Sequence, residues 1–130
     1  MIILTIRTDK PESEIGLYDD HTQLNYIKWE AHRQLAETLH NVTQEMVTAQ
    51  NMTLANIDGI VIFQGPGSFT GLRIGISMAN ALAYGLKVPI IGRQNESWIE
   101  DGVAELIARN NALPVIPFYG SDANITTPKK

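Results

Sequence analysis

Cysteine is absent from this sequence of 130 residues. Disulfide bonds, thiolate metal ligands and a cysteine nucleophile are therefore excluded, and the absence fits a cytoplasmic protein. Basic residues are also scarce, because 10 Lys and Arg stand against 14 Asp and Glu, for a formal net charge of -4. A protein that holds nucleic acid by its own field needs a concentrated basic surface, so any contact with RNA is expected to be shared with a partner.

Long apolar runs are missing too. The apolar start of the chain ends at Arg7, Asp9 and Lys10, which leaves no room for the hydrophobic region of a signal peptide, and no run approaches the length of a membrane span. Apolar residues make up 44% and charged residues 18%, the balance of a folded globular domain. We expect a soluble cytoplasmic protein with one domain over 1–110 and a C-terminal extension over 111–130 whose end is disordered.

The first half of the sequence predicts an antiparallel meander followed by a helix. Short apolar stretches indicate strands over 2–6, 15–18 and 24–29. The apolar period then lengthens, which predicts a helix over 32–50. Its apolar stripe recurs at intervals of four, three, four and three residues, at Leu35, Leu39, Val42, Met46 and Ala49.

The second half predicts a parallel crossover. In order we expect a buried strand at Ile57 and 59–63, a helix over 72–86, a strand over 88–91, and a helix over 96–109 capped by Asn95. A strand, a helix and another strand in series make a right-handed parallel unit. The sequence therefore predicts an α/β fold with a mixed five-stranded sheet and helices packed on it.

The connection between the buried strand and the second helix is the most informative segment. It packs three glycines and a proline into 65–71, and glycine permits close backbone approach at a helix start, where unpaired amides suit an anion. A tight strand-to-helix turn without ligand explains the same residues equally well. Ser68 and Thr70 could simply cap the helix, and Arg73 is more readily explained by a structural role. The candidate anion or nucleotide loop consists of Gly65, Gly67, Ser68, Phe69, Thr70, Gly71 and Arg73.

The eleven residues GPGSFTGLRIG, from Gly65 to Gly75, resemble the signature of the TsaB (YeaZ) family, within the wider actin, sugar kinase and Hsp70 fold. The resemblance covers roughly residues 1–100 and matches the N-terminal lobe only. It implies an actin-like, ribonuclease H-like lobe and a non-catalytic partner subunit in the biosynthesis of N6-threonylcarbamoyladenosine in tRNA. Older names in this superfamily suggest a peptidase, but no nucleophile setting is recognisable here.

Two features of the sequence depart from that family or from its catalytic relatives. The first strand runs into Arg7-Thr8-Asp9, where the family usually has an Asp-Thr-Ser type of turn, so independent nucleotide hydrolysis is not expected. The catalytic TsaD relatives carry a close histidine pair for metal, whereas His32 and His40 lie eight residues apart. We therefore expect no metal or cofactor held by this chain alone, with ATP and Mg²⁺ only at an interface shared in a complex.

The helix over 72–86 is apolar on nearly every face, so one face can cover the sheet and the rest needs another partner. The first helix of the same chain could cover all of it. Alternatively, both helices meet another protein in a four-helix bundle. The resemblance implies a TsaD-like catalytic subunit or a second copy as that protein, with a TsaE-like ATPase as a further candidate and tRNA met only indirectly. The candidate interface residues are Leu35, Leu39, Val42, Met46, Gly75, Ile76, Ala79 and Ala83.

Stand-alone binding of nucleotide or phosphate with weak ATPase activity is the alternative function. It would use the loop over 65–71 rather than the helix surface, and it predicts measurable ATP affinity of the isolated chain.

Overall fold

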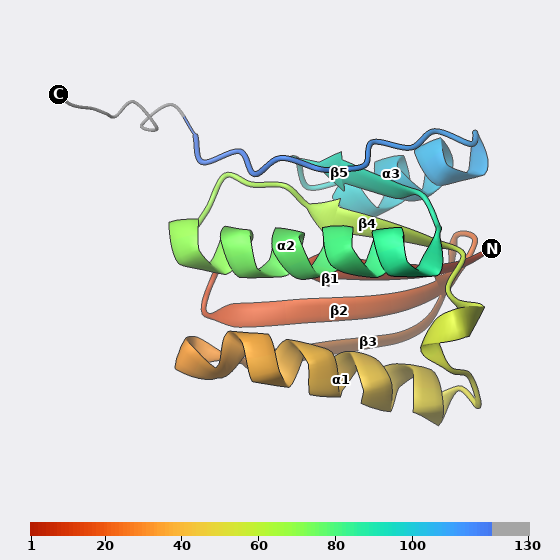
Figure 1. Cartoon of the computed structure of the whole chain (residues 1–130), viewed down its shortest axis with the longest axis horizontal. Coiled ribbons are helices and arrows are strands. Elements are labelled where there is room, and N and C mark those ends of the chain that lie inside the picture. The colour runs from red at the N-terminus through yellow and green to blue at the C-terminus, as the bar shows by residue number, and fades with distance from the viewer. Residues whose placement is uncertain (121–130) are drawn as a thin grey trace, which may run out of the picture.

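A computed structural model of the chain describes residues 1–120 (Figure 1). The expected disorder at the end of the chain concerns 121–130, which lie outside the described residues. In chain order the elements are β1 (Ile2–Arg7), β2 (Glu12–Asp19), β3 (Thr22–Glu30), the 3-10 helix η1 (His32–Gln34), α1 (Leu35–Ala49), the 3-10 helix η2 (Leu54–Asn56), β4 (Gly59–Phe63), α2 (Phe69–Leu86), β5 (Ile90–Arg93) and α3 (Trp98–Ile107).

The five strands form one mixed sheet in the order β3-β2-β1-β4-β5. β1 pairs with β2, and β2 with β3, in antiparallel fashion, which confirms the predicted meander. β4 pairs with β1 and β5 in parallel, so α2 is the crossover helix that the sequence predicts. Leu4 of β1 lies opposite Leu17 on one side and Ile60 on the other, which places β1 at the centre of the sheet.

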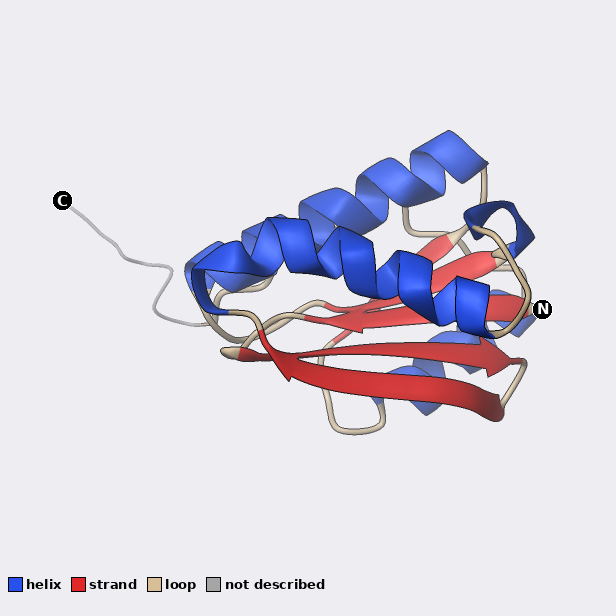
Figure 2. Cartoon of the chain, turned by 90° about the horizontal axis from the view of Figure 1, so that it is seen from below, coloured by secondary structure: helices blue, strands red, loops and turns tan. Residues whose placement is uncertain are grey.

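The helices cover the two faces of this sheet unequally, as Figure 2 shows: α1 and α2 lie on one face and α3 on the other. Successive side chains of a strand point to opposite faces, and β1 follows this rule. Leu4 and Ile6 pack with α1 and α2, whereas Ile3 packs with Trp98 and Leu106 of α3. Because β1 and β4 are covered on both faces near the centre, their apolar runs are nearly continuous.

Two predicted helix starts are wrong. α2 begins at Phe69 rather than at residue 72, with Ser68 as its N-cap, and the Ser68 Oγ accepts a hydrogen bond from the Gly71 amide. The helix therefore includes residues 69–71, and Gly71 lies in its first turn, where a glycine is tolerated. α3 begins at Trp98 with Ser97 as N-cap, so Asn95 is not the cap. Instead the Asn95 carbonyl accepts from the Trp98 amide one turn before the helix.

Residues 111–119 form an extended segment, here called the C-terminal strap, that lies alongside α2 and the end of β4. The Asn80 side chain donates to the carbonyl of Val115 and accepts from its amide, at 2.9 and 2.8 Å. The Gln64 side chain donates to the Ile116 carbonyl at 2.7 Å, and the Phe118 amide donates to the Gln64 carbonyl at 2.9 Å. Val115 thereby reaches the core shared by α1 and α2.

Within residues 1–120, none of the helices is both long enough and apolar enough to cross a membrane.

Candidate functional site

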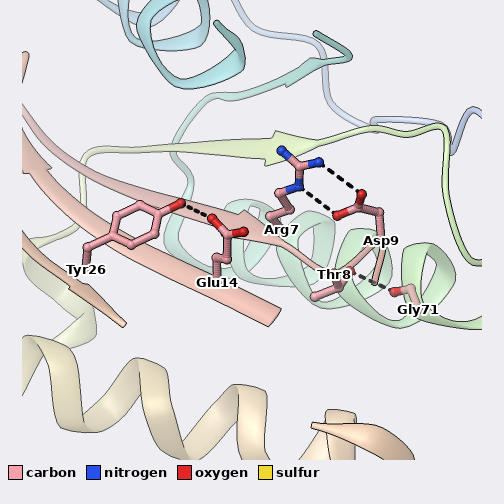
Figure 3. A network of polar contacts seen from close by, with 6 residues as sticks. All are labelled: Arg7, Thr8, Asp9, Glu14, Tyr26 and Gly71. Carbon is pink, nitrogen blue, oxygen red and sulfur yellow. Dashed lines mark hydrogen bonds and ion pairs between the residues drawn. The ribbon is translucent and has the colours of Figure 1, made fainter. Parts of the chain in front are cut away.

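The β1–β2 turn and the start of α2 are bonded directly to one another. Thr8 donates its hydroxyl to the Gly71 carbonyl at 2.8 Å, and the Ser68 amide donates to the Asp9 carbonyl at 2.9 Å (Figure 3 shows the first of these). A Cβ on Gly71 would lie 2.2 Å from the Thr8 carbonyl oxygen, and one on Gly67 would lie 2.3 Å from the Asp9 Cβ. These two glycines therefore serve a close approach of the chain to itself.

The first glycine of the loop meets the C-terminal strap. Gly65 has a φ of +125°, and a Cβ there would lie 2.0 Å from the Phe118 carbonyl oxygen. Both facts require glycine at this position. The structure thus assigns an intramolecular contact to each of Gly65, Gly67 and Gly71, which favours the tight-turn interpretation of the glycines.

The remaining loop residues are exposed at the start of α2. Phe69 is 56% exposed, and its ring lies against the Tyr119 ring with 4.6 Å between centroids. The Arg73 guanidinium lies 5.3 Å from the Phe69 centroid, so this arginine contacts an aromatic ring rather than a loop carbonyl. Ser68 and Thr70 are also exposed, and only Ser68 is the cap.

Arg7, at the end of β1, is paired within the chain. Its Nε lies 2.8 Å and its NH2 nitrogen 3.1 Å from the two carboxylate oxygens of Asp9, whose side chain is only 6% exposed (Figure 3). The guanidinium also lies over the Phe63 ring, 3.9 Å from its centroid. The charge that the sequence places at the end of the central strand is therefore neutralised by a residue two positions along.

Beside this pair, Tyr26 of β3 donates its hydroxyl to the buried carboxylate of Glu14 (Figure 3). Burial of the phenol raises the pKa of Tyr26 strongly, and the hydrogen bond to Glu14 raises it further. The Glu14 carboxylate accepts from this neutral phenol, and its charge also interacts with the cation of Arg7, its partner in the β1–β2 register. Gly16 makes room for this arrangement, because a Cβ there would lie 2.8 Å from atoms of both Tyr18 and Tyr26.

Most of the residues predicted to contact a partner are buried in the interior of the fold. Their exposed fractions are 6% or less for Leu35, Leu39, Met46, Ile76, Ala79 and Ala83. Gly75 is buried as well, and Val42 is half-buried. These side chains pack on the sheet, so any partner surface on α1 and α2 has to be built from the neighbouring rows of the two helices.

Those neighbouring rows enclose a groove of about 290 Å³ on the outer side of the two helices. We call it the α1–α2 groove, and its lining is His40, Thr43, Leu54, Met78, Ala81 and Leu82. His40 and Ala81 are exposed, and Met78 and Leu82 are half-buried. The sequence of α2 identifies these residues as apolar. Because nearly every face of the helix is apolar, the sequence does not indicate which row of side chains faces the sheet.

Among the described side chains of residues 1–120, no cluster of three or more His, Asp or Glu is suited to a metal ion.

Comparison with known proteins agrees with this architecture. The profile of the family TsaD, tRNA N6-adenosine threonylcarbamoyltransferase, matches residues 29–98, more than half of the chain. The tRNA threonylcarbamoyladenosine biosynthesis protein TsaB of Escherichia coli is 31% identical over 118 residues, which cover 86% of this chain and 51% of that protein. The chain thus spans about half the length of this curated relative.

Solved structures show the same fold. YeaZ from Pseudomonas aeruginosa superposes with a TM-score of 0.67 at 23% identity, covering 78% of this chain and 50% of that one. RuvC of Thermus thermophilus superposes with a TM-score of 0.51 at 9% identity, covering 72% and 64%. The lobe is therefore actin-like and ribonuclease H-like, as predicted. The chain belongs to the TsaD family, and within it the chain is a homologue of the TsaB (YeaZ) proteins.

Proposed function

We propose that this chain is a non-catalytic partner subunit in the biosynthesis of N6-threonylcarbamoyladenosine in tRNA, and that it acts by binding a TsaD-like catalytic subunit. Its family and its homology to TsaB over 86% of the chain support the pathway. Because the chain spans about half of that relative, the proposal concerns an interaction that one lobe, over 1–110, can make by itself.

The observation that carries the proposal is the α1–α2 groove. Met78 and Leu82 face it half-exposed, and Ala81 at its rim leaves space for a close neighbour. Apolar side chains between two neighbouring helices are covered most fully when a second helix pair packs into the groove. A helix pair of the catalytic subunit would complete a four-helix bundle, whose contacts are Met78, Ala81 and Leu82 rather than the buried rows.

In the absence of that subunit, a second copy of the chain is the proposed occupant. A twofold pair presents the same groove from both copies and hides both from water. A TsaE-like ATPase joins the assembly in this proposal, ATP and Mg²⁺ bind only at a shared interface, and tRNA is contacted through the partner. The net charge of -4 supports the last point. In this proposal the protein acts in the cytoplasm.

A non-catalytic role is supported by the end of β1. Arg7 and Asp9 neutralise one another there and leave no unpaired carboxylate in this pair to hold a cation. The glycines of the following loop contact the chain's own backbone and side chains. Both observations disfavour ATPase or peptidase activity of the isolated chain.

The proposal is tested by the mass of the protein in solution, measured by light scattering alone and with a TsaD subunit. Ala81→Glu places a charge in the groove and is expected to abolish the heteromer and the homodimer. Ala104→Glu makes the same change at an exposed position of α3, on the opposite face of the sheet, and is expected to leave both intact. A wild-type monomer that is indifferent to TsaD would refute the proposal and favour nucleotide binding.

A further inference from the structure

A second cavity, of about 540 Å³, lies at the C-terminal end of α2, where the helix turns into the link to β5 and meets the C-terminal strap (Figure 1). It shares no lining residue with the α1–α2 groove. We propose that this cavity, here called the helix-end cavity, binds a small aromatic carboxylate. The inference is independent of the partner proposed above.

Apolar groups form most of the helix-end cavity. Ala83 is fully buried beneath it, and Val88 and Pro89, which lead into β5, are half-buried. Tyr84 and Leu113 also line it, with 77% and 37% of their surface exposed. The volume falls within the range of small-molecule sites, about 300–1,000 Å³, which combine apolar walls with few polar groups. A ligand here would cover two large apolar side chains that the lobe leaves in water.

Asn111 contributes a hydrogen-bond donor whose position is fixed. Its Oδ1 accepts from the Ile90 amide at 3.1 Å and from the Leu113 amide at 3.3 Å. Because two backbone groups hold the oxygen, the orientation of the whole side-chain amide is set. The Nδ2 of Asn111 donates to none of the described residues. Since Asn111 lines the cavity, this nitrogen is available to an acceptor on a ligand.

The charges around the cavity favour an anion. Among the described residues that line it, Lys87 is the one with a charged side chain. The end of a helix carries roughly half a negative charge, which the full positive charge of Lys87 outweighs. The carbonyls of Ala83 and Tyr84, in the last turn of α2, already accept from backbone amides and are not free to hold a cation. A carboxylate, in contrast, can accept from both Lys87 and the Asn111 Nδ2.

The exposed ring of Tyr84 favours an aromatic body for the ligand. This ring contacts no other ring of the described chain. A pair of aromatic rings gains more than the burial of their area alone, so an aromatic ligand uses this surface best. The ligand therefore places its carboxylate at Lys87 and Asn111 and its ring against Tyr84.

The site is tested with phenylacetate at pH 7, where the acid is ionised, followed by amide chemical shifts in ¹H–¹⁵N spectra. Saturable shifts are expected at Gly85 and Val88, which line the cavity. Phenylacetamide has the same ring without the charge and should bind severalfold more weakly. Acetate, which lacks the ring, should give no saturable shifts at equal ionic strength. Unsaturable shifts with phenylacetate, or equal affinity for phenylacetate and phenylacetamide, would overturn the proposal.

Three substitutions separate the contributions to binding. Lys87→Met removes the charge and keeps the alkyl stem, and it is expected to lower phenylacetate affinity about threefold to fivefold, the effect of an exposed ion pair, without changing phenylacetamide affinity. Tyr84→Ala should lower the affinity for both compounds. Asn111→Asp retains the oxygen that holds the two amides but replaces the donor by an acceptor. It should therefore weaken the binding of phenylacetate more than that of phenylacetamide.

Lys28→Met is the matched control. Lys28 is also exposed, but it lies on β3, at the opposite edge of the sheet from β5. This variant is expected to keep wild-type affinity for phenylacetate. Unfolding midpoints should stay at the wild-type value in Lys87→Met and Tyr84→Ala, because both side chains are exposed. Wild-type affinity in Lys87→Met, or an equal loss in Lys28→Met, would overturn the proposal.

Discussion

The amide side chain of Asn80 binds both backbone groups of Val115, donating to the carbonyl at 2.9 Å and accepting from the amide at 2.8 Å. Asn80 belongs to α2 and Val115 to the C-terminal strap, so one side chain joins segments 35 residues apart. An asparagine amide has a donor and an acceptor at the correct spacing for a peptide group, which makes it a specific partner for an extended segment.

Replacing Asn80 by Ala is expected to lower the free energy of unfolding by about 1–3 kcal/mol, because two backbone groups beside a buried valine lose their partners. Asn80→Asp keeps the acceptor for the Val115 amide but removes the donor, and its stability should be intermediate. Urea denaturation of the three proteins measures this order. Equal stability of wild type and Asn80→Ala would show that water replaces the side chain at no cost.

Replacing two glycines of α2 by alanine should change the stability of the protein in opposite directions. A Cβ on Gly75 would lie 2.1 Å from the Thr8 Oγ1, and we expect Gly75→Ala to cost about 1–3 kcal/mol through overpacking and displacement of Thr8. Around Gly85 no atom lies within 4 Å of such a Cβ, so Gly85→Ala should stabilise the protein by about 0.5–1 kcal/mol through helix propensity. Thermal and urea unfolding of both variants test the pair, and stabilisation by Gly75→Ala would contradict the packing described.

The Arg7–Asp9 pair predicts strong coupling in a double-mutant cycle. Arg7→Gln leaves the Asp9 carboxylate, 6% exposed, without its cation, and is expected to cost roughly 3 kcal/mol. Asp9→Asn should cost less, because the arginine is 21% exposed and keeps the Phe63 ring beneath it. The double variant should be more stable than the sum of the single losses predicts. Additive losses would mean that the two charges do not depend on one another.

Stability should fall at alkaline pH because of Tyr26. Its pKa is raised in the folded protein, by burial and by the bond to Glu14, so the folded state keeps the phenolic proton at pH values where the unfolded state has lost it. This contribution is fully present below the ordinary tyrosine pKa of about 10 and is lost progressively as the pH rises above it. Urea midpoints between pH 8 and 11 should decline less steeply in Tyr26→Phe, and an identical decline in both proteins would exclude Tyr26 as the cause.

The strands and α1 could be predicted because their signals are local. β1 and β4 are short apolar runs, and α1 carries its buried Leu35, Leu39 and Met46 at helical spacing. The buried row of α2 could not be chosen, because Met78, Ala81 and Leu82 on its outer rows are as apolar as Ile76 and Ala79 on its inner row. Only the position of the sheet distinguishes these rows, and that position follows from pairings distant in sequence.

The glycines identify the candidate loop in the sequence. Their role, however, depends on residues distant in sequence, which no local pattern reveals. Glycine disfavours a helix, yet Gly71 lies inside α2. A glycine is needed there because Thr8 from the β1–β2 turn occupies the space that a side chain would take. The bonds of Asn80 and Gln64 to the C-terminal strap likewise join side chains to distant backbone.

The strap's attachment at Gln64 and Gly65 has a mechanical consequence. Gln64 directly follows β4, bonds to the strap at Ile116 and Phe118, and is followed at once by the loop that leads into α2. The far end of that loop is fastened to the β1–β2 turn through Ser68 and Asp9. A displacement of Gly120 would therefore be transmitted through Phe118 and Gln64 to the loop that leads into α2. Because α2 forms one side of the α1–α2 groove, such a displacement would also move one wall of the groove.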